Sequence, residues 1–254
     1  MRKNPQASFN LWITDLLASM VFVFLLILVI HSLALKTEQE KLLREKEKLQ
    51  HPLTLRQNIL EKVQALLNQE GLEAQVLVKE GILRLTEKTI AFPIGQAMPY
   101  KEQLENLAKL ANVLQSVLPC FSHQPGSEAT GEAPPAWCSQ KEIPPSTCPS
   151  QSRGSLDTIL VEGHTDAMPL KPGLMFRDNL SLSASRATTV LRVLKSCRNE
   201  LDGLSNKRGH PLLAASGYSY LRPIVAEDPN DPRNRRIDIR FLMSFDSPSG
   251  MEEP

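Results

Sequence analysis

Two charged side chains, Asp166 and Arg186, stand in a pattern that suits the recognition of a zwitterion. Asp166 ends the segment 161–166 (VEGHTD), just past an expected strand, and Arg186 lies in the segment 179–187 (NLSLSASRA), early in an expected helix. A helix N-terminus attracts anions, and a guanidinium group holds a carboxylate through two hydrogen bonds. An aspartate beside it offers a place for an ammonium group. The alternative is an Asp166–Arg186 ion pair that only ties loop to helix, and spacing alone leaves both open.

Other polar residues of these segments favour structural roles. His164 could indicate metal or acid–base chemistry, but no partner cluster accompanies it in sequence, so we expect a hydrogen-bonded structural histidine. Ser183 is interpreted as a helix cap and not as a nucleophile. No catalytic dyad, triad or metal constellation is visible, so we predict neither an enzyme nor a metal site. A net charge of +1 gives no electrostatic reason to expect a nucleic-acid partner.

An apolar segment without formal charge extends over residues 16–35. A membrane-spanning helix needs about 20 such residues. A signal peptide is the rival, because Arg2 and Lys3 supply a basic start, but its apolar core is usually only about 7–15 residues long. A charge-dense segment follows in place of a cleavage site, so we predict an uncleaved anchor. The basic start favours a cytoplasmic N-terminus.

Asp15 stands where this apolar segment begins, and two interpretations compete for it. Thr14 or Asp15 could cap the start of the helix. If the helix instead begins near Asn10, Asp15 lies inside the membrane edge, where a carboxylate is costly and marks ion pathways. Trp12, which suits the membrane interface, precedes Asp15 and favours the second interpretation slightly.

The remaining pattern predicts a single anchor followed by one α+β domain, with helices packed on one face of a mixed sheet. A charged helical stalk is expected over 36–71, interrupted at Pro52. We expect strands at 74–78, 82–86, 157–162, 212–216 and 236–243, and helices at 100–118 and 179–198. The predicted parts are a cytoplasmic start (1–10), a transmembrane helix (11–35), the stalk (36–71), the domain (72–243) with a Pro-rich insert (119–155), and a tail (244–254).

Four cysteines indicate disulfides in a compartment outside the cytoplasm, because no CxxC or CxH spacing supports the alternative of a zinc site. Cys120 follows one expected helix and Cys197 ends the other. Both helices should run antiparallel to strands of one sheet, so their C-terminal ends should share an edge. We therefore predict a Cys120–Cys197 bridge, with Cys138–Cys148 inside the insert.

Taken together, the segments 161–166, 179–187, 217–218 (GY) and 234–239 (NRRIDI) resemble the OmpA-like peptidoglycan-binding family over roughly 82–243, without the insert. The resemblance implies that Asp166 holds the amino group of diaminopimelate in a stem peptide and that Arg186 holds its carboxylates. It also implies that Asn234 and Arg235 line the same site and that Asn179 supports it. No cofactor is implied.

The layout of the whole chain, with Trp12 and Asp15 at an N-terminal span, resembles MotB-like stator subunits. In that family the aspartate carries H⁺ or Na⁺ beside a multi-span MotA-like partner, and two B subunits form a homodimer. The short start and the Cys-bearing insert look more like ZorB subunits of Zorya anti-phage defence systems, whose partner is ZorA-like. A flagellar-type stator subunit and a passive tether between inner membrane and cell wall are the alternatives.

Overall fold

The computed structural model describes residues 5–124, 134–138, 143–149, 152–170 and 175–245, and the side chains from residue 14 onward. The chain forms two compact units, residues 1–51 and 52–254, which we describe separately. The predicted start 1–10, tail 244–254 and insert 119–155 therefore lie partly outside the described residues, and so does the side chain of Trp12.

From residue 5 onward, where its description begins, the first unit is a single helix. Helix α1 (Pro5–Gln69) begins here and continues into the second unit. It contains an apolar stretch with a mean hydropathy of 2.7, long enough to cross a membrane, and the side chains of this stretch are exposed. The hydroxyls of Ser19 and Thr37 donate to the carbonyls of Leu16 and Ala34, one turn back, so they add no unsatisfied polar group to the helix surface.

Helix α1 does not stop at Pro52, which corrects the predicted interruption. A proline inside a helix removes one backbone hydrogen bond and crowds the preceding turn. The turns that follow Pro52 offset this cost because their apolar side chains are buried in the second unit: Leu55, Ile59, Leu60, Val63 and Leu67. The segment 52–69 is thus part of the folded domain. The prediction had placed it in a solvated stalk over 36–71.

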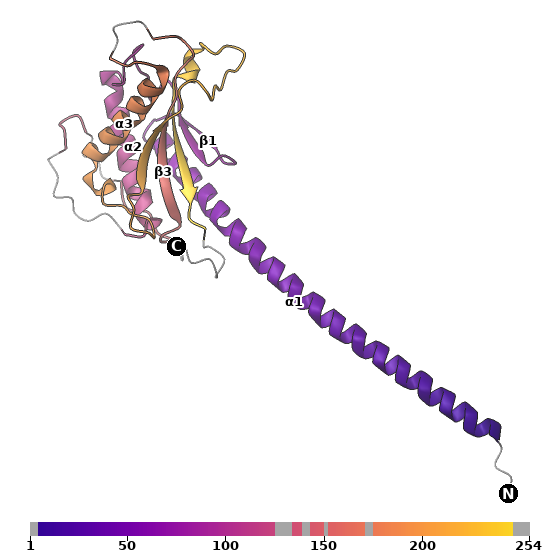
Figure 1. The fold of residues 1–254 in the computed structure, drawn as a ribbon. Helices are drawn as coiled ribbons and strands as arrows, with labels where there is room; N and C mark the ends of the chain where they lie inside the picture. Colours follow the sequence, from indigo (N-terminus) through magenta and orange to yellow (C-terminus); the bar gives the residue numbers. More distant parts are fainter. Residues whose placement is uncertain (1–4, 125–133, 139–142, 150–151, 171–174, 246–254) are drawn as a thin grey trace. The chain divides into compact units, whose positions relative to one another are not determined.

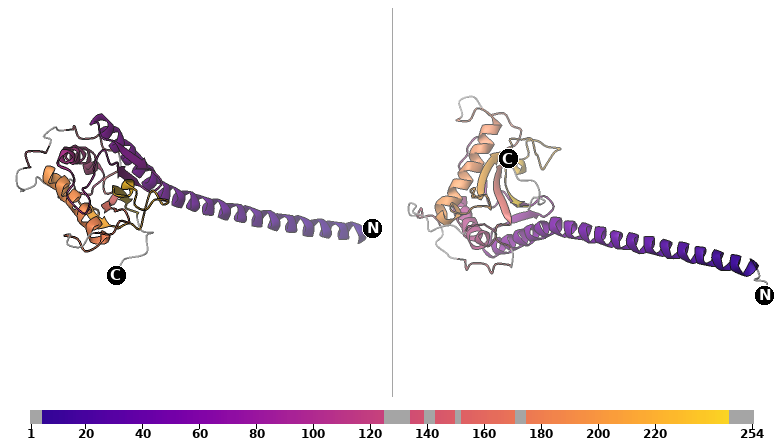
Figure 2. Two further views of the ribbon diagram at one scale, coloured as in Figure 1. Left: turned by 90° about the horizontal axis from the view of Figure 1, so that it is seen from above. Right: turned by 60° about the horizontal axis from the view of Figure 1, so that its bottom comes forward.

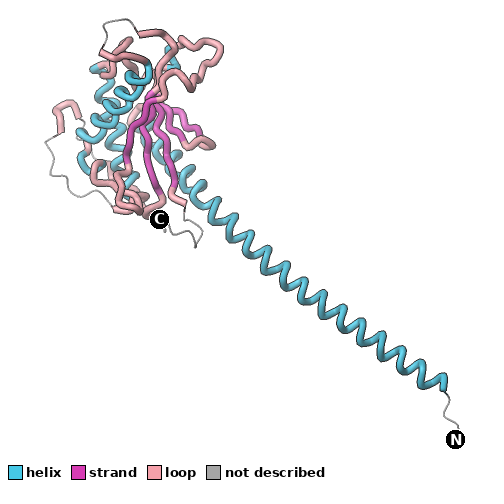
Figure 3. Tube along the Cα trace, viewed as in Figure 1, coloured by secondary structure: helices cyan, strands magenta, loops and turns pink. Residues whose placement is uncertain are grey.

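The second unit is built on a five-stranded mixed sheet (Figure 3). The strands are β1 (Ala74–Leu77), β2 (Ile82–Leu85), β3 (Leu156–Gly163), β4 (Leu213–Gly217) and β5 (Ile237–Met243), in the order β1-β2-β5-β3-β4. All neighbours are antiparallel except β3 and β4, which are parallel. The predicted α+β class with a mixed sheet is confirmed.

Two helices, α2 (Leu104–Val117) and α3 (Asn179–Cys197), lie on one side of this sheet (Figures 1 and 2). Helix α3 packs on β3 and β4, and α2 packs on α3. Alternate residues of the central strands, such as Val161 and Ile239, are fully buried in the core beneath them. The charged residues between them, Glu162 and Asp238, therefore belong to the opposite face of the sheet.

The disulfides join Cys120 to Cys148 and Cys138 to Cys197, which corrects both predicted bridges. The prediction considered only the two helix ends as partners for each other. Instead, the insert returns to the domain, where Trp137 packs against the core and Cys138 is itself buried. Each helix end is therefore tied to the insert, and the insert is fastened at two points.

Candidate functional site at the ends of β3 and β4

The first turns of α3 lie directly against the ends of β3 and β4. Asp178 caps the helix by accepting a hydrogen bond from the Ser181 amide (2.8 Å), and the Ser181 side chain accepts one from the Asp178 amide. Gly163 and Gly217 end the two strands. A β-carbon at Gly163 would lie 2.0 Å from the Ser183 carbonyl oxygen, and one at Gly217 would lie 2.4 Å from the Ala184 amide nitrogen. Only glycine permits this close approach, which brings Arg186 near the loop after β3.

Ser183 fastens this arrangement from inside the helix. Its buried hydroxyl donates to the Leu180 carbonyl (2.8 Å) and accepts from the Ser219 amide (2.9 Å). Ser219 has a φ of 55°, in the left-handed region that non-glycine residues rarely adopt, and its carbonyl accepts from the Thr165 amide. Ser183 is therefore a link between helix and loop, whereas the cap that we expected at this position is made by Asp178.

Asp166 forms an ion pair with Arg235. Arg235 Nη1 lies 2.7 Å from Asp166 Oδ2, and both side chains are mostly buried, with exposed fractions of 21% for Arg235 and 10% for Asp166. Among the described residues Asp166 makes no direct ion pair with Arg186, so the alternative of a structural Asp166–Arg186 pair is wrong. Asp166 and Arg235 nevertheless both act electrostatically on Arg186, which places the three charges in one neighbourhood.

Arg186 is buried, with only 1% of its surface exposed. Its Nε donates to the Gln96 carbonyl (2.9 Å), one Nη donates to the Pro93 carbonyl (3.3 Å), and its guanidinium lies 4.8 Å from the centre of the Phe92 ring. Burial, reinforced by the charge of Arg235, lowers the pKa of Arg186 to about 10, so it remains a cation at neutral pH. Within the described chain its Nη1 has no hydrogen-bond partner.

Two neutral side chains beside this charge triad also keep unused polar atoms. The Thr165 hydroxyl and the Asn179 Oδ1 are buried without a hydrogen-bond partner among the described residues. The Asn179 amide nitrogen donates to the carbonyls of Asp166 (3.4 Å) and Met168 (3.0 Å), so this side chain supports the loop after β3. Buried polar atoms are nearly always paired in native proteins, so an unpaired one calls for a partner outside the chain, such as a water molecule, an ion or a ligand.

Asn234 does not line the site, which corrects that expectation. Its Oδ1 accepts from the amides of Ile224 and Val225, and its amide nitrogen donates to carbonyls of the same loop, including that of Asp228. The side chain is fully buried. Asn234 therefore shapes the loop that precedes Arg235, and of the two only Arg235 is available to a ligand.

His164 belongs to a buried charge network on the sheet face opposite α2 and α3. Its ring stacks on Tyr218 (centroids 5.5 Å apart), and its Nε2 lies 3.6 Å from Asp238 Oδ2, beyond hydrogen-bond distance. Burial, together with the charge of Arg236, lowers the pKa of His164 to about 3. The histidine is thus structural and neutral, but neither ring nitrogen has the hydrogen bond that we expected within the described residues.

Glu162, His164 and Asp238 lie close enough together to resemble a metal site, but the two carboxylates are already paired with arginines. Arg240 binds Glu162 through two hydrogen bonds (2.6 and 3.0 Å). Arg84 and Arg236 bind Asp238 at 2.9 and 3.0 Å. Burial alone would raise the pKa of Asp238, but the hydrogen bond and charge of Arg84 and the charge of Arg236 lower it. Three guanidiniums around two carboxylates repel a cation, so this cluster is an ion-pair network.

No protein-family model and no curated protein matches the chain. Solved structures do. A MotB-like protein from Desulfovibrio vulgaris shares 17% identity at a TM-score of 0.49, over 77% of this chain and 98% of that one. The periplasmic domain of Helicobacter pylori MotB shares 21% at 0.41, over 64% and 76%. The cell wall anchor of the T6SS from Pseudomonas aeruginosa shares 18% at 0.43, over 73% and 97%. At such identities and scores the function must be argued from the site itself.

The sequence pattern missed the segment 92–96, which supplies the ring and both carbonyls that hold Arg186. Pro93 and Gly95 do indicate a turn there, and Gly95 has a φ of 69°. The sequence could not show that carbonyls of this turn bind Arg186, because backbone carbonyls have no signature in sequence. Asp178 was also missed as the cap, although an aspartate directly before a helical pattern is a standard signal.

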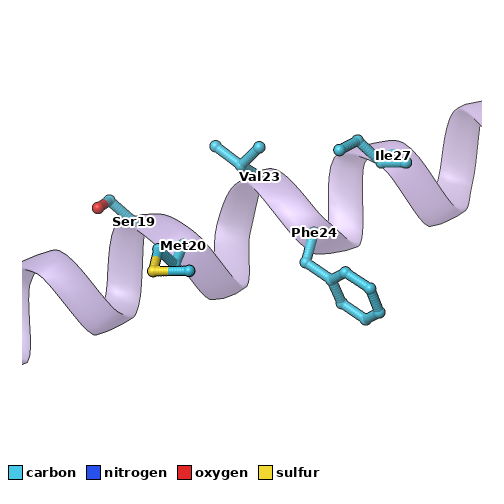
Figure 4. A pocket seen from close by; sticks show the side chains of 5 residues that line it. All are labelled: Ser19, Met20, Val23, Phe24 and Ile27. Atoms are coloured by element: carbon cyan, nitrogen blue, oxygen red, sulfur yellow. The ribbon is translucent and has the colours of Figure 1, made fainter.

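In the first unit, Asp15 lies well inside α1, because that helix already begins at Pro5. The helix-cap interpretation of Asp15 is therefore wrong. Ser19 follows Asp15 by one helical turn, so the two side chains share a side of the helix. From Ser19 to Ile27 the side chains that border an open hollow along the helix are Ser19, Met20, Val23, Phe24 and Ile27 (Figure 4).

Proposed function

We propose that this chain is a membrane-anchored protein whose second unit binds peptidoglycan stem peptides at the Asp166–Arg235–Arg186 site. One observation carries the proposal: Arg186 is buried with Nη1 unpartnered, beside a fixed ion pair. An unsatisfied donor on a charged buried group costs about 1–3 kcal/mol or more. A ligand carboxylate would satisfy this donor, and the free end of diaminopimelate carries one. The resemblance of segments 161–166, 179–187 and 234–239 to OmpA-like domains supports the same ligand.

We further propose a bacterial inner-membrane location, with one span, a cytoplasmic N-terminus and the second unit in the periplasm. The apolar stretch of α1 supports the span. Two disulfides support an oxidising compartment for the domain, because such bonds are rare in the cytosol. The basic residues Arg2 and Lys3 support the orientation.

Retention on isolated peptidoglycan sacculi tests the binding role. We expect the full-length chain in detergent to be retained on diaminopimelate-type sacculi, and Arg186→Gln to weaken retention about tenfold or more because the carboxylate loses a charge-assisted bond. The matched control is Arg192→Gln, which removes an exposed arginine from the same helix. Equal retention of the two variants, each checked for an unchanged unfolding transition, would contradict the assignment.

For the anchor we propose a motor role in which Asp15 carries H⁺ or Na⁺, as in MotB-like stator subunits. The position of Asp15 inside an apolar helix supports this, because a carboxylate there needs a partner or a proton. The proposal includes a homodimer and a multi-span MotA- or ZorA-like partner, with a ZorB-like role in anti-phage defence suggested by the resemblance of the whole chain. A flagellar-type stator role, which also needs Asp15 to carry the ion, is the alternative, and a passive tether is the role that remains if Asp15 carries no ion.

Ion flux tests the role of Asp15. With the chain and its multi-span partner in proteoliposomes, we expect Asp15→Asn to abolish proton- or sodium-driven flux, because an amide cannot exchange a proton or pair with a cation. Glu38→Gln on the same helix, beyond the apolar stretch, is the control and should leave flux intact. If the Asp15→Asn variant shows the flux of wild type, Asp15 carries no ion and only the passive tether role remains.

A further inference from the structure

The two disulfides of the second unit interleave along the chain. Cys120 pairs with Cys148 and Cys138 pairs with Cys197, so each bridge encloses one cysteine of the other. Four cysteines allow three pairings, and this is the only one in which the bridges cross. No cysteine is therefore bonded to the cysteine nearest to it in sequence.

Chain entropy favours wrong bridges before the domain folds. The native bridges join cysteines 28 and 59 positions apart, whereas Cys138 lies ten positions from Cys148 and eighteen from Cys120. The probability that a flexible loop closes falls as about the 3/2 power of its length. In the unfolded chain Cys148 therefore meets Cys138 about fivefold more often than it meets Cys120, and Cys138 meets Cys148 about 14-fold more often than it meets Cys197.

The order in which the cysteines reach the periplasm acts in the same direction. On the proposed topology Cys120, Cys138 and Cys148 cross the membrane before Cys197. Cys138 then enters an oxidising compartment with two wrong partners close by, and its native partner follows 59 positions later. Early oxidation thus adds to the bias toward wrong bridges at Cys138.

The contacts that select the native pairing come from the folded helices. Trp137 packs against the core, and the adjacent Cys138 is bonded to Cys197 at the end of α3. The Ser146 amide donates to the carbonyl of Ser116, near the end of α2, at 2.9 Å. The unfolded chain lacks these contacts, so nothing in it offsets the bias toward the shorter loops.

The two bridges also differ in their access to exchange after folding. Cys138 and Cys197 are only 3% and 1% exposed, whereas Cys148 is exposed. Exchange requires a thiolate to reach a disulfide sulfur. The Cys120–Cys148 bridge therefore stays open to exchange in the folded domain, but the Cys138–Cys197 bridge must be set before the core closes over it.

We propose that a thiol–disulfide isomerase of the periplasm is a folding partner of this chain and corrects wrong bridges at Cys138. This inference rests on the periplasmic location in the proposed function and adds a partner to it. The partner is defined by its chemistry, a reactive thiolate that exchanges with accessible disulfides.

The exchange is balanced without an oxidant or a reductant. Starting from Cys120–Cys138 and Cys148–Cys197 bridges, the isomerase thiolate attacks the Cys138 sulfur, forms a mixed disulfide and releases the Cys120 thiolate. Cys120 then attacks the Cys148 sulfur and releases the Cys197 thiolate. Cys197 attacks the Cys138 sulfur of the mixed disulfide and releases the isomerase thiolate. The chain holds two disulfides before and after these steps.

Oxidation of the full-length chain tests the proposal. The reduced, urea-denatured chain is diluted into detergent with a thiol oxidase, with or without a reduced disulfide isomerase, and the bridges are mapped by mass spectrometry of non-reduced peptides. We expect the oxidase alone to give mainly Cys138–Cys148 and Cys120–Cys138 bridges, and the isomerase to raise the native fraction about fivefold. Equal native fractions with and without the isomerase would overturn the proposal.

Two double variants are the matched controls. Cys138→Ala with Cys197→Ala leaves only the Cys120–Cys148 pair, and Cys120→Ala with Cys148→Ala leaves only the other native pair. Each variant can form a single bridge within the chain, so we expect its oxidation to be independent of the isomerase. A dependence as large as that of wild type would show that the isomerase assists folding without exchange, and this too would overturn the proposal.

Bridge mapping in bacterial cells separates this proposal from the proposed location. In a strain that lacks periplasmic disulfide isomerase we expect wrong bridges at Cys138, and in its parent strain native ones. Native bridges in both strains would overturn the proposal and leave the periplasmic location in place. Four free thiols in both strains would contradict the periplasmic location and the proposal with it.

Discussion

At the scale of single residues, His164 couples the stability of the domain to pH. Its pKa is lowered from 6.5 to about 3 in the folded chain, so the unfolded chain binds the extra proton between these values. This stability is fully present above pH 6.5 and is lost progressively as pH falls toward 3. At pH 5 the loss is about 2 kcal/mol relative to pH 7.5.

Urea unfolding at pH 7.5 and pH 5 measures this coupling. We expect His164→Gln to lose less stability on acidification than wild type, by the amount that His164 contributed. His210→Gln, which replaces an exposed histidine, should follow wild type. Parallel pH dependence in all three chains would mean that His164 does not stay neutral when buried.

Sequence reasoning at this scale found the charged side chains of the candidate site but not their partners within the chain. Asp166 and Arg186 were identified by their types and positions, and Asn179 through the resemblance to OmpA-like domains. The pairing of Asp166 with Arg235 across 69 positions, and the carbonyls of Pro93 and Gln96 on Arg186, depend on how loops fold back. No local pattern encodes such contacts, and the same gap led to the wrong role for Asn234.

At the scale of elements, the close approach of α3 to β3 depends on Gly163. A β-carbon there would lie 2.0 Å from the Ser183 carbonyl, a backbone atom that cannot rotate away. We expect Gly163→Ala to destabilise the domain by about 3 kcal/mol and to weaken sacculus retention, because α3 must move away from β3 and from the loop after it, which carries Asp166.

Gly209→Ala is the comparison for this prediction. Gly209 has a φ of 77° but no atom within 4 Å of its would-be β-carbon, so only backbone strain of about 1 kcal/mol is expected, with retention unchanged. Thermal unfolding and sacculus binding measure both effects. Similar losses for the two variants would show that steric contact with α3 does not matter.

Element types were predictable because apolar periodicity is a local property. Every expected strand and both domain helices are present, with ends displaced by only a few residues, as for α3 (179–198 expected, Asn179–Cys197 found). The predicted interruption at Pro52 was wrong because burial of the apolar side chains that follow Pro52 offsets the local cost of a proline in the helix. The predicted disulfide pairing was also wrong, because the path of the insert has no periodic pattern in the sequence from which it could be predicted.

At the scale of the whole molecule, the boundary between stalk and domain lies at Pro52 and not at residue 71. Five side chains of the last turns of α1 are fully or almost fully buried in the core: Leu55, Ile59, Leu60, Val63 and Leu67. Burial of one such side chain contributes about 1.5–3 kcal/mol, so the set contributes on the order of 10 kcal/mol, an upper estimate. That is comparable with the total stability of an ordinary domain, about 5–15 kcal/mol.

Two truncated chains therefore differ sharply. A chain that begins at Pro52 keeps the core complete, and we expect it to unfold cooperatively, remain monodisperse and bind sacculi. A chain that begins at Leu72 exposes the apolar surface that α1 covers, and we expect it to aggregate or to lose its cooperative transition. Both keep all four cysteines, so disulfide formation does not distinguish them. Cooperative unfolding of the shorter chain at an unchanged temperature would show that residues 52–69 are only a linker after all.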